Sequence, residues 1–353
     1  MQRVRPEVLA APGYHLSAYD CPIKLNQNES PFDVPDDVKS EVLETVRGLS
    51  WSRYPLPMPT DLVEALAAHV GQDPDGVIVC NGSNTLIQLI LAMTCVPDAS
   101  VVVPSPSFSL YGLYGGIFGG RVVSVALTRS YAFDVPAIAE TVRREGANVV
   151  VLCSPNNPTG CALSNPELGE LLDQSDALFL IDEAYGEFSD TTSLDLLSDH
   201  ANLIVLKTFS KAFGAAGIRV GYMVAHPELA REIAKGKIPF DINLFSHAAA
   251  LRILSEGDMA RDRAATICAE RDRVFAALGG LEGVSAYPSQ ANFILFQVTD
   301  PKATFAGLVD RGVLVRDVTS YPMLDRALRV SIGTREENDR FLEALQETLA
   351  PIQ

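Results

Sequence analysis

The sequence predicts an α/β fold with a large domain, built on a mostly parallel, doubly wound sheet, and a smaller α+β domain. The first observation is a series of short apolar runs that do not alternate with polar residues, which is typical of parallel strands buried on both faces. The second is a change of pattern after about residue 255, where fewer strands and a closing helix are expected. A chain of 353 residues can bury a core large enough for both units.

The first part of the chain combines helical patterns with apolar runs. A short amphipathic helix is expected after Pro35, a second over residues 61–70 and a third over 85–93, because apolar side chains recur there at helical spacing. The runs predicted as strands of the large sheet are 77–80, 101–103, 122–125, 149–152, 178–181 and 203–206.

The last hundred residues have a different organisation. Strands are expected over 293–296, 313–315 and 328–332, and a closing helix over 336–349. We therefore predict a large domain over residues 40–250. The small domain is expected to combine residues 1–39 with 251–353.

Composition excludes some classes of partner. The formal net charge is −16, whereas nucleic acids and anionic membranes require clustered Lys and Arg. The six cysteines form no Cys-x-x-Cys pair, and no histidine cluster has metal-ligand spacing, so free thiols and no metal are expected. The start of the chain has no apolar segment of a secretory signal, and no long uncharged apolar stretch follows. A reducing, cytoplasmic setting fits these features best.

Polar motifs follow several of the predicted strands, at the edge where ligands of parallel α/β sheets bind. Residues 182–185 read Asp-Glu-Ala-Tyr, and residues 210–214 read Ser-Lys-Ala-Phe-Gly. Alone, Lys211 would be a solvated loop lysine and Asp182 a helix cap. Together they suggest an enzyme that holds pyridoxal phosphate as a Schiff base, because that cofactor needs an amine for its aldehyde and an anion for its ring nitrogen.

The other requirements of pyridoxal phosphate also have candidates. Tyr185 or Asn157 could donate a hydrogen bond to the phenolate oxygen. Tyr111 could stack on the ring, although it could equally be a core aromatic. The phosphate has four candidates: Ser83 and Asn84 at a predicted helix N-terminus, and the side chains of Ser210 and Arg219. The glycines after the lysine do not have the order of a dinucleotide-binding fingerprint, so that cofactor is rejected.

These motifs resemble a known family. Residues 157–160 (Asn-Pro-Thr-Gly), 182–185 and 210–211, with Arg219, are similar to those of fold-type-I pyridoxal-phosphate-dependent aminotransferases. Finer motifs resemble the histidinol-phosphate aminotransferase subfamily, and they lie at 24–31, 52–55, 106–111, 288–293 and 328–334. Two positions depart from that pattern: Asn84-Thr85 replaces a common Asp-Glu, and Pro239-Phe240 replaces a common Pro-Tyr.

The resemblance implies roles for individual residues. Lys211 would form the Schiff base and move protons, Asp182 would pair with the ring nitrogen, and Asn157 and Tyr185 would bind the phenolate oxygen. Ser83, Asn84, Ser210 and Arg219 would hold the phosphate, and Tyr111 would stack on the ring. Tyr54 would reach the phosphate of a neighbouring subunit, which implies a homodimer with shared sites.

On the substrate side, the resemblance implies that Arg329 grips an acidic group, with Arg316, Tyr14 and Asn157 as further candidates. Arg316 could also be a surface arginine of a strand. The implied reaction is ping-pong transamination of histidinol phosphate with 2-oxoglutarate, giving imidazole acetol phosphate and glutamate in histidine biosynthesis. Transamination of aromatic amino acids and decarboxylation of a threonine-phosphate-type substrate remain alternatives. A non-enzymatic regulatory domain is a further alternative, but no DNA-binding module is visible.

Overall fold

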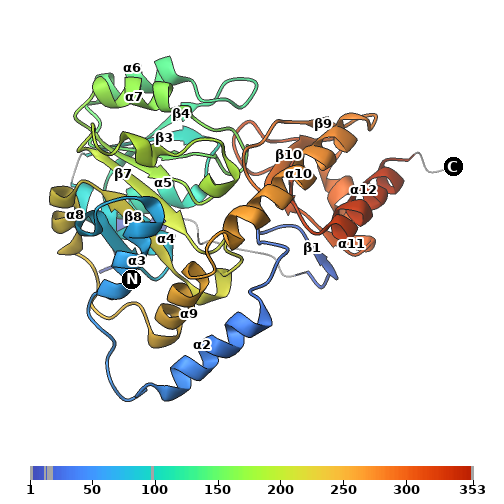
Figure 1. The fold of residues 1–353 in the computed structure, drawn as a ribbon. Helices are drawn as coiled ribbons and strands as arrows, with labels where there is room; N and C mark the ends of the chain where they lie inside the picture. The colour runs from blue at the N-terminus through green and yellow to red at the C-terminus, as the bar shows by residue number, and fades with distance from the viewer. Residues whose placement is uncertain (1–2, 12, 14–18, 97–98, 351–353) are drawn as a thin grey trace.

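A seven-stranded sheet forms the centre of the larger part of the molecule in the computed structural model (Figure 1). The structure describes residues 3–11, 13, 19–96 and 99–350. The strand order is β2-β8-β7-β6-β5-β3-β4. The bounds are β2 (Val77–Cys80), β3 (Ser100–Ser105), β4 (Arg121–Ala126), β5 (Val149–Cys153), β6 (Leu178–Asp182), β7 (Leu203–Thr208) and β8 (Gly221–Ala225). All six predicted runs are therefore strands of one sheet, and the predicted fold class is confirmed.

Two strands differ from the prediction. β8 was not predicted, because its flanking glycines gave the segment the composition of a loop, and it runs antiparallel to both β2 and β7. β4 was predicted to be buried on both faces, but it lies at the edge of the sheet and only Val125 is buried within it. An edge strand has one neighbour fewer, so its apolar residues remain partly exposed.

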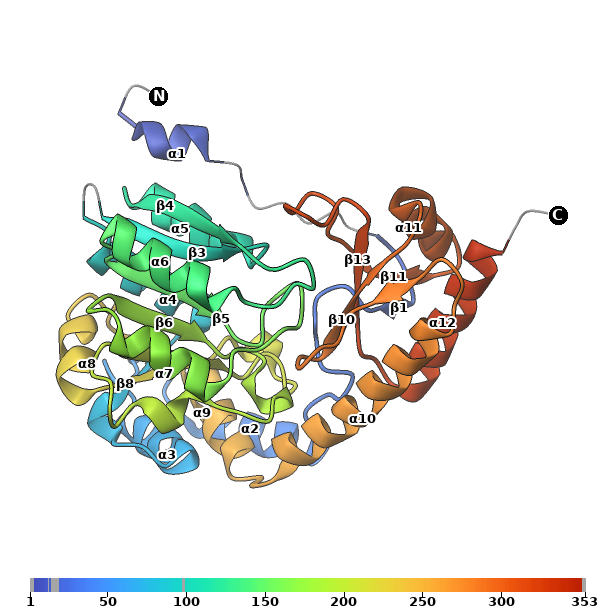
Figure 2. The same ribbon diagram turned by 90° about the horizontal axis from the view of Figure 1, so that it is seen from above.

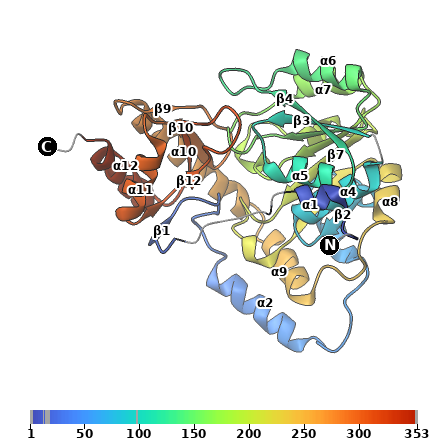
Figure 3. The ribbon, with the colours of Figure 1, turned by 180° about the vertical axis from the view of Figure 1, so that it is seen from behind.

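Helices cover both faces of this sheet, as expected for a doubly wound fold (Figure 2). One face packs against α4 (Ser83–Thr94), α5 (Ser109–Ile117) and α8 (Pro227–Ala234). The opposite face packs against α3 (Thr60–Val70), α6 (Val135–Glu145) and α7 (Asn165–Asp173). The short helix α1 (Pro6–Ala10) lies beside α5 on the outside of the molecule (Figure 3).

The smaller part is built on an antiparallel sheet of four strands, in the order β12-β13-β10-β9. The bounds are β9 (Ser285–Ala286), β10 (Phe293–Gln297), β12 (Arg316–Asp317) and β13 (Ala327–Ser331). Helices α11 (Pro301–Asp310) and α12 (Arg335–Leu349) pack beside it. A capping box between Thr334 and Glu337 starts α12 close to the predicted position.

Three elements connect the two parts. The helices α2 (Asp36–Gly48) and α9 (Leu244–Leu254) pack together beneath the large sheet, and α10 (Met259–Gly279) extends from there to the small sheet (Figures 1 and 2). The N-terminal strand β1 (Ile23–Lys24) pairs in parallel with β11 (Val313–Leu314). The segment after β1 therefore passes between the two sheets. Within the described residues, no helix combines the length and the apolar character needed to span a bilayer.

Candidate active site

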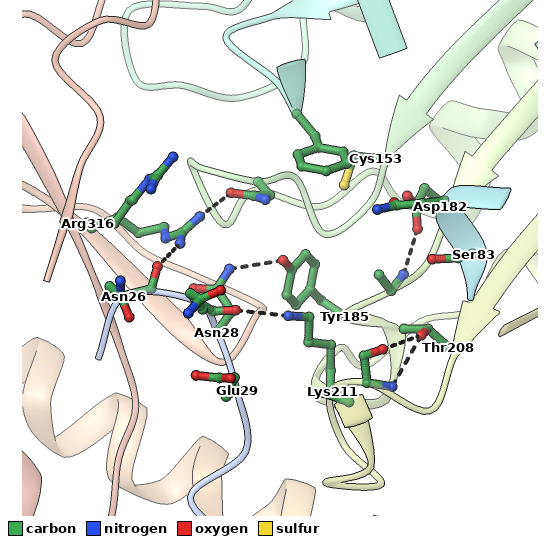
Figure 4. A pocket seen from close by; sticks show the side chains of 18 of the residues that line it. Asn26, Asn28, Glu29, Ser83, Cys153, Asp182, Tyr185, Thr208, Lys211 and Arg316 are labelled. Atoms are coloured by element: carbon green, nitrogen blue, oxygen red, sulfur yellow. Dashed lines mark hydrogen bonds between the residues drawn. The ribbon is translucent and has the colours of Figure 1, made fainter. Parts of the chain in front are cut away.

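A cavity of about 310 Å³ lies at the carboxyl ends of β5, β6 and β7, next to the small sheet (Figure 4). Eleven of the residues predicted from the sequence line it, and they come from both parts of the molecule. They are Ser83, Asn84, Tyr111, Asn157, Asp182, Tyr185, Ser210, Lys211, Arg219, Arg316 and Arg329. Two others do not line it: Tyr54 lies elsewhere, and Tyr14 is outside the described residues.

Lys211 follows β7 and points its amine across the cavity (Figure 4). The Nζ atom donates to the backbone oxygen of Gln27 at 3.0 Å. Burial in the cavity, followed by the positive charge of Arg329, lowers the pKa of Lys211 to about 8. A substantial fraction of this amine is therefore neutral near physiological pH, which is the form that attacks a carbonyl carbon.

Asp182 ends β6 and is only 4% exposed. One carboxylate oxygen accepts from the backbone N–H of Ala184 at 3.0 Å, and the other accepts from the hydroxyl of Tyr111 at 2.7 Å. The bond to the Ala184 N–H resembles a helix cap, which is the other role that the sequence allows for Asp182. Both donors are neutral, and burial raises the pKa of Asp182. A cationic ring nitrogen in the cavity would favour the ionised carboxylate.

The stacking role of Tyr111 stays a prediction, and the structure offers a second candidate for it. The side chain of Tyr111 borders the cavity, but it is fully buried and its hydroxyl is bound to Asp182. Phe108 contacts it edge to face, with 5.4 Å between the ring centroids. Phe108 also lines the cavity and is partly exposed, so its ring is more accessible to a ligand than that of Tyr111. Both residues belong to one short motif, and spacing alone could not tell which ring turns inward.

Asn157 meets Arg329 across the cavity. The guanidinium Nη1 donates to the Oδ1 of Asn157 at 2.5 Å, and Nη2 donates to the backbone oxygen of Asn26 at 2.7 Å. The guanidinium also lies 5.1 Å from the ring centroid of Phe293, which is cation–π geometry. Because Oδ1 of Asn157 accepts from the arginine, the NH₂ group of the same amide is its remaining donor.

Tyr185 is held by the N-terminal segment rather than by its own strand. The side-chain amide of Asn28 donates to the Tyr185 hydroxyl at 2.9 Å, and both side chains are buried (Figure 4). The Tyr185 ring packs edge to face on Phe293, with 5.1 Å between centroids. We call residues 26–29 the strap, because they pass between the two sheets and contact both sides of the cavity.

The start of α4 forms a cradle for an anion. Gly82 has a positive φ of 79°, and a Cβ at this position would lie 2.4 Å from Nη2 of Arg219. Arg219 donates to the Ser210 hydroxyl at 3.2 Å. The first turn of α4 carries no acidic residue and has no side-chain cap, so the replacement of Asp-Glu by Asn84-Thr85 leaves its N–H groups and positive dipole end available to an anion.

Several lining residues were not predicted. In the sequence the strap is only part of a family motif, because neither periodicity nor charge indicates that it reaches Lys211 and Tyr185. Thr208 shares a hydrogen bond with Ser210 at 3.0 Å, and its position two residues before that serine was the only signal. The remaining unpredicted side chains include Phe108, Cys153 and Tyr321.

Tyr54 lies on the surface, away from the cavity. Its side chain is 83% exposed, and its ring centroid is 4.9 Å from that of Phe240. Phe240 stands where the resembling family commonly has a tyrosine, and it is also exposed. A pair of exposed aromatic rings is unusual on a free surface and is enriched at protein–protein interfaces.

The whole chain is also similar to proteins of known activity. Residues 21–345 match the sequence profile of the family described as aminotransferase class I and II. A histidinol-phosphate aminotransferase of Chlorobaculum tepidum is 40% identical over 92% of this chain and 94% of its own length. The crystal structure of histidinol-phosphate aminotransferase from Sinorhizobium meliloti in complex with pyridoxal 5′-phosphate is 25% identical, with a TM-score of 0.89, and the match covers 99% of this chain and 98% of that one.

One solved structure carries a different activity. L-threonine-O-3-phosphate decarboxylase from Porphyromonas gingivalis is similar with a TM-score of 0.82, over 93% of this chain and 99% of that one. The two sequences are 24% identical, so this likeness concerns the fold alone.

Proposed function

The chain belongs to the aminotransferase class I and II family, and from that premise we propose that it transfers the amino group of histidinol phosphate to 2-oxoglutarate. The products would be imidazole acetol phosphate and glutamate. The observation that carries this proposal is a single cavity that contains an amine with a lowered pKa, a buried carboxylate and an anion cradle. This cavity lies between the domains that we assign to residues 40–250 and to 1–39 with 251–353.

The residues fit pyridoxal phosphate. When bound, this cofactor supplies an aldehyde that captures amines and a protonated ring that withdraws electrons from the α-carbon. The space around Gly82 and Arg219 suits its phosphate, and the carboxylate of Asp182 suits its ring nitrogen. Phe108 joins Tyr111 as a residue that could stack on the ring.

Lys211 has two tasks in this proposal. Its neutral amine would bind the cofactor aldehyde, with release of water, before substrate arrives. Once a substrate amine had taken its place, the freed Lys211 Nζ would accept the proton from the substrate α-carbon and would return a proton to the former aldehyde carbon. General acid–base help of this kind contributes about a hundred- to ten-thousandfold in rate.

Two arginines support an acidic substrate. Arg316 and Arg329 occupy directly opposite positions on the neighbouring strands β12 and β13. Like charges opposite each other destabilise a sheet, and an anion between them would relieve the repulsion. A phosphate group with two negative charges would neutralise both guanidinium groups, whereas the α-carboxylate of an aromatic amino acid carries a single charge. This difference favours histidinol phosphate over the aromatic amino acids.

A panel of amino donors tests the proposal. Purified protein loaded with pyridoxal phosphate should be yellow. With 2-oxoglutarate, the kcat/KM for histidinol phosphate should exceed that for tyrosine or phenylalanine by about a hundredfold, because their singly charged carboxylate would make fewer charge-assisted hydrogen bonds to the two arginines than a phosphate. Equal values for all three donors would favour an aromatic aminotransferase. Release of carbon dioxide from phosphothreonine without an oxo acid would favour a decarboxylase.

We also propose a homodimer, in which Tyr54 reaches the phosphate in the cavity of the neighbouring subunit. The exposed Tyr54–Phe240 pair supports it, because a second subunit would cover these rings. Sedimentation equilibrium should give twice the mass of the 38.0 kDa chain. A monomer would contradict this part of the proposal. The free thiols are compatible with the reducing cytoplasm, where we propose that the enzyme acts.

A further inference from the structure

The hydroxyl of Tyr185 has a defined hydrogen-bonding direction. Asn28 Nδ2 donates to it at 2.9 Å, and the amide and the phenol are 1% and 5% exposed. Among the residues that the structure describes, Asn28 is the hydrogen-bond partner of the Tyr185 hydroxyl. Since the oxygen accepts this N–H, its own hydrogen must point in another direction.

The orientation of the Asn28 amide is fixed from the small sheet. Ser331 Oγ accepts the backbone N–H of Asn28 at 2.8 Å and donates to its Oδ1 at 3.1 Å. A flipped amide would present NH₂ to Ser331, and the serine hydrogen would lose this acceptor. The oxygen of Asn28 therefore faces Ser331 and its NH₂ group faces Tyr185.

The backbone of Asn28 is held as firmly as its side chain. Its φ is +54°, in the left-handed region that asparagine tolerates better than most residues. Its carbonyl oxygen accepts from the side chain of Asn292 at 3.1 Å, and Asn292 is fully buried. These contacts make the strap a rigid part of the cavity wall.

We propose that Asn28 is a positioning residue that sets the hydrogen-bond polarity of Tyr185. By occupying a lone pair of the Tyr185 oxygen, it commits the tyrosine hydrogen to the cavity, where an anionic phenolic oxygen of the bound cofactor would accept it. Ser331 transmits this orientation from β13 across 303 positions of the chain. The inference rests on the proposed function and concerns how the proposed cofactor is held.

Charged groups around Tyr185 must be separated from this effect. Burial is the main reason that its pKa is raised, and the charge of Arg329 on β13 opposes the shift. Cys153 on β5 and Asp182 on β6 face it as well. The Lys211 Nζ lies 5.7 Å from its ring centroid. A test must therefore distinguish a change of polarity from a change of charge.

The experiment measures the pH at which the visible absorbance band of the cofactor-loaded enzyme titrates. Asn28→Asp offers an acceptor in place of a donor, so the Tyr185 hydrogen would turn away from the phenolic oxygen. The loss of this hydrogen bond would leave more negative charge on the phenolic oxygen of the cofactor. The Lys211 nitrogen, bound to the cofactor aldehyde nearby, would then keep its proton to higher pH. We expect the titration midpoint to rise by about one to two pH units.

Two controls separate charge and backbone effects. Asn26→Asp adds the same charge to the strap at a side chain that makes no hydrogen bond to Tyr185 within the described residues, and its shift indicates the size of the electrostatic part. Asn28→Gly removes the amide without adding charge and tolerates the positive φ, so it should raise the midpoint by less than about one unit. Thermal melting of each variant verifies that it folds.

The decisive comparison repeats both Asn28 substitutions in a Tyr185→Phe background. If Asn28 acts through the hydroxyl, Asn28→Gly should have no effect there, and Asn28→Asp should keep only the shift that Asn26→Asp shows. Equal shifts in the two backgrounds, or no shift in either, would overturn the inference. A wild-type protein that shows no visible band with pyridoxal phosphate would instead contradict the proposed function, and the inference with it.

Discussion

Two lysines near the end of β7 have opposite surroundings. Lys207 lies within the strand, with its Nζ 3.2 Å from a carboxylate oxygen of Glu183 and 3.1 Å from one of Glu187. Burial alone would lower its pKa, but these two carboxylates more than offset it and the pKa is raised. For Lys211, in the following loop, burial and the charges of Arg329 and Arg219 outweigh the carboxylates of Glu29 and Asp182, and its pKa is lowered to about 8.

The difference shows that burial does not decide the chemistry of a lysine by itself. Both amines leave bulk water, yet the sign of the neighbouring charge makes one a permanent cation and the other a nucleophile. Glu183 lies between Asp182 and Tyr185, so the Lys207 cluster also ties the end of β6 to β7. The first region stabilises the scaffold, and the second region carries the chemistry.

Replacement of Lys211 should have the largest effect. Lys211→Ala removes the only amine proposed to bind the cofactor aldehyde, so the visible band should disappear and turnover should fall by at least about a thousandfold. Absorbance spectra and steady-state rates measure both. The surface lysine control Lys235→Ala should retain both properties, and a yellow, active Lys211→Ala protein would refute the assignment.

Replacement of Lys207 should affect stability rather than chemistry. Lys207→Met leaves the buried carboxylate of Glu183 and the partly exposed one of Glu187 without their cation. Removing one partner of a buried ion pair typically costs about 3–5 kcal/mol. Urea denaturation of the cofactor-free protein would show this loss, while the position of the visible band should not change. Lys207→Arg keeps the charge and should recover part of the stability. An unaltered unfolding midpoint for Lys207→Met would mean that the cluster contributes little.

The pH dependence of cofactor uptake should show the smallest effect. The neutral amine of Lys211 is the reactive form, so the rate at which cofactor-free protein gains the visible band should rise about tenfold per pH unit below its pKa. Above about pH 8 the rate should level off. Stopped-flow absorbance between pH 6 and 9.5 measures the profile. A rate that continues to rise toward the ordinary lysine pKa of 10.5 would show that Lys211 resembles an exposed lysine.

The large-domain side of the cavity was the part that sequence could predict. Asp182 follows an apolar strand directly, so its place in the chain also fixes its place at the edge of the sheet. The same holds for Asn157, Ser210 and Lys211, which lie close after strand ends. For these residues, the position in the sequence directly after a strand also gives the position in space at the carboxyl edge of the sheet. The fold class and this group of residues could therefore be inferred together.

The opposite side could not be predicted in the same way. Asn28 meets Tyr185 across 157 positions and Ser331 across 303, and no periodic pattern relates them. Helix geometry at the start of α5 buries Tyr111 and leaves Phe108 in the cavity, a choice that residue type does not determine. β8 was missed because its flanking glycines concealed a buried strand.

The pairing of β1 with β11 also has a consequence for biosynthesis. Ile23 lies opposite Val313, so the strap cannot take its place until almost the whole polypeptide has left the ribosome. The seven-stranded sheet, which ends at Ala225, can assemble while translation continues. Residues 23–29 are synthesised early but are therefore among the last to become ordered, and a nascent chain stalled before residue 313 would contain a sheet without a finished pocket.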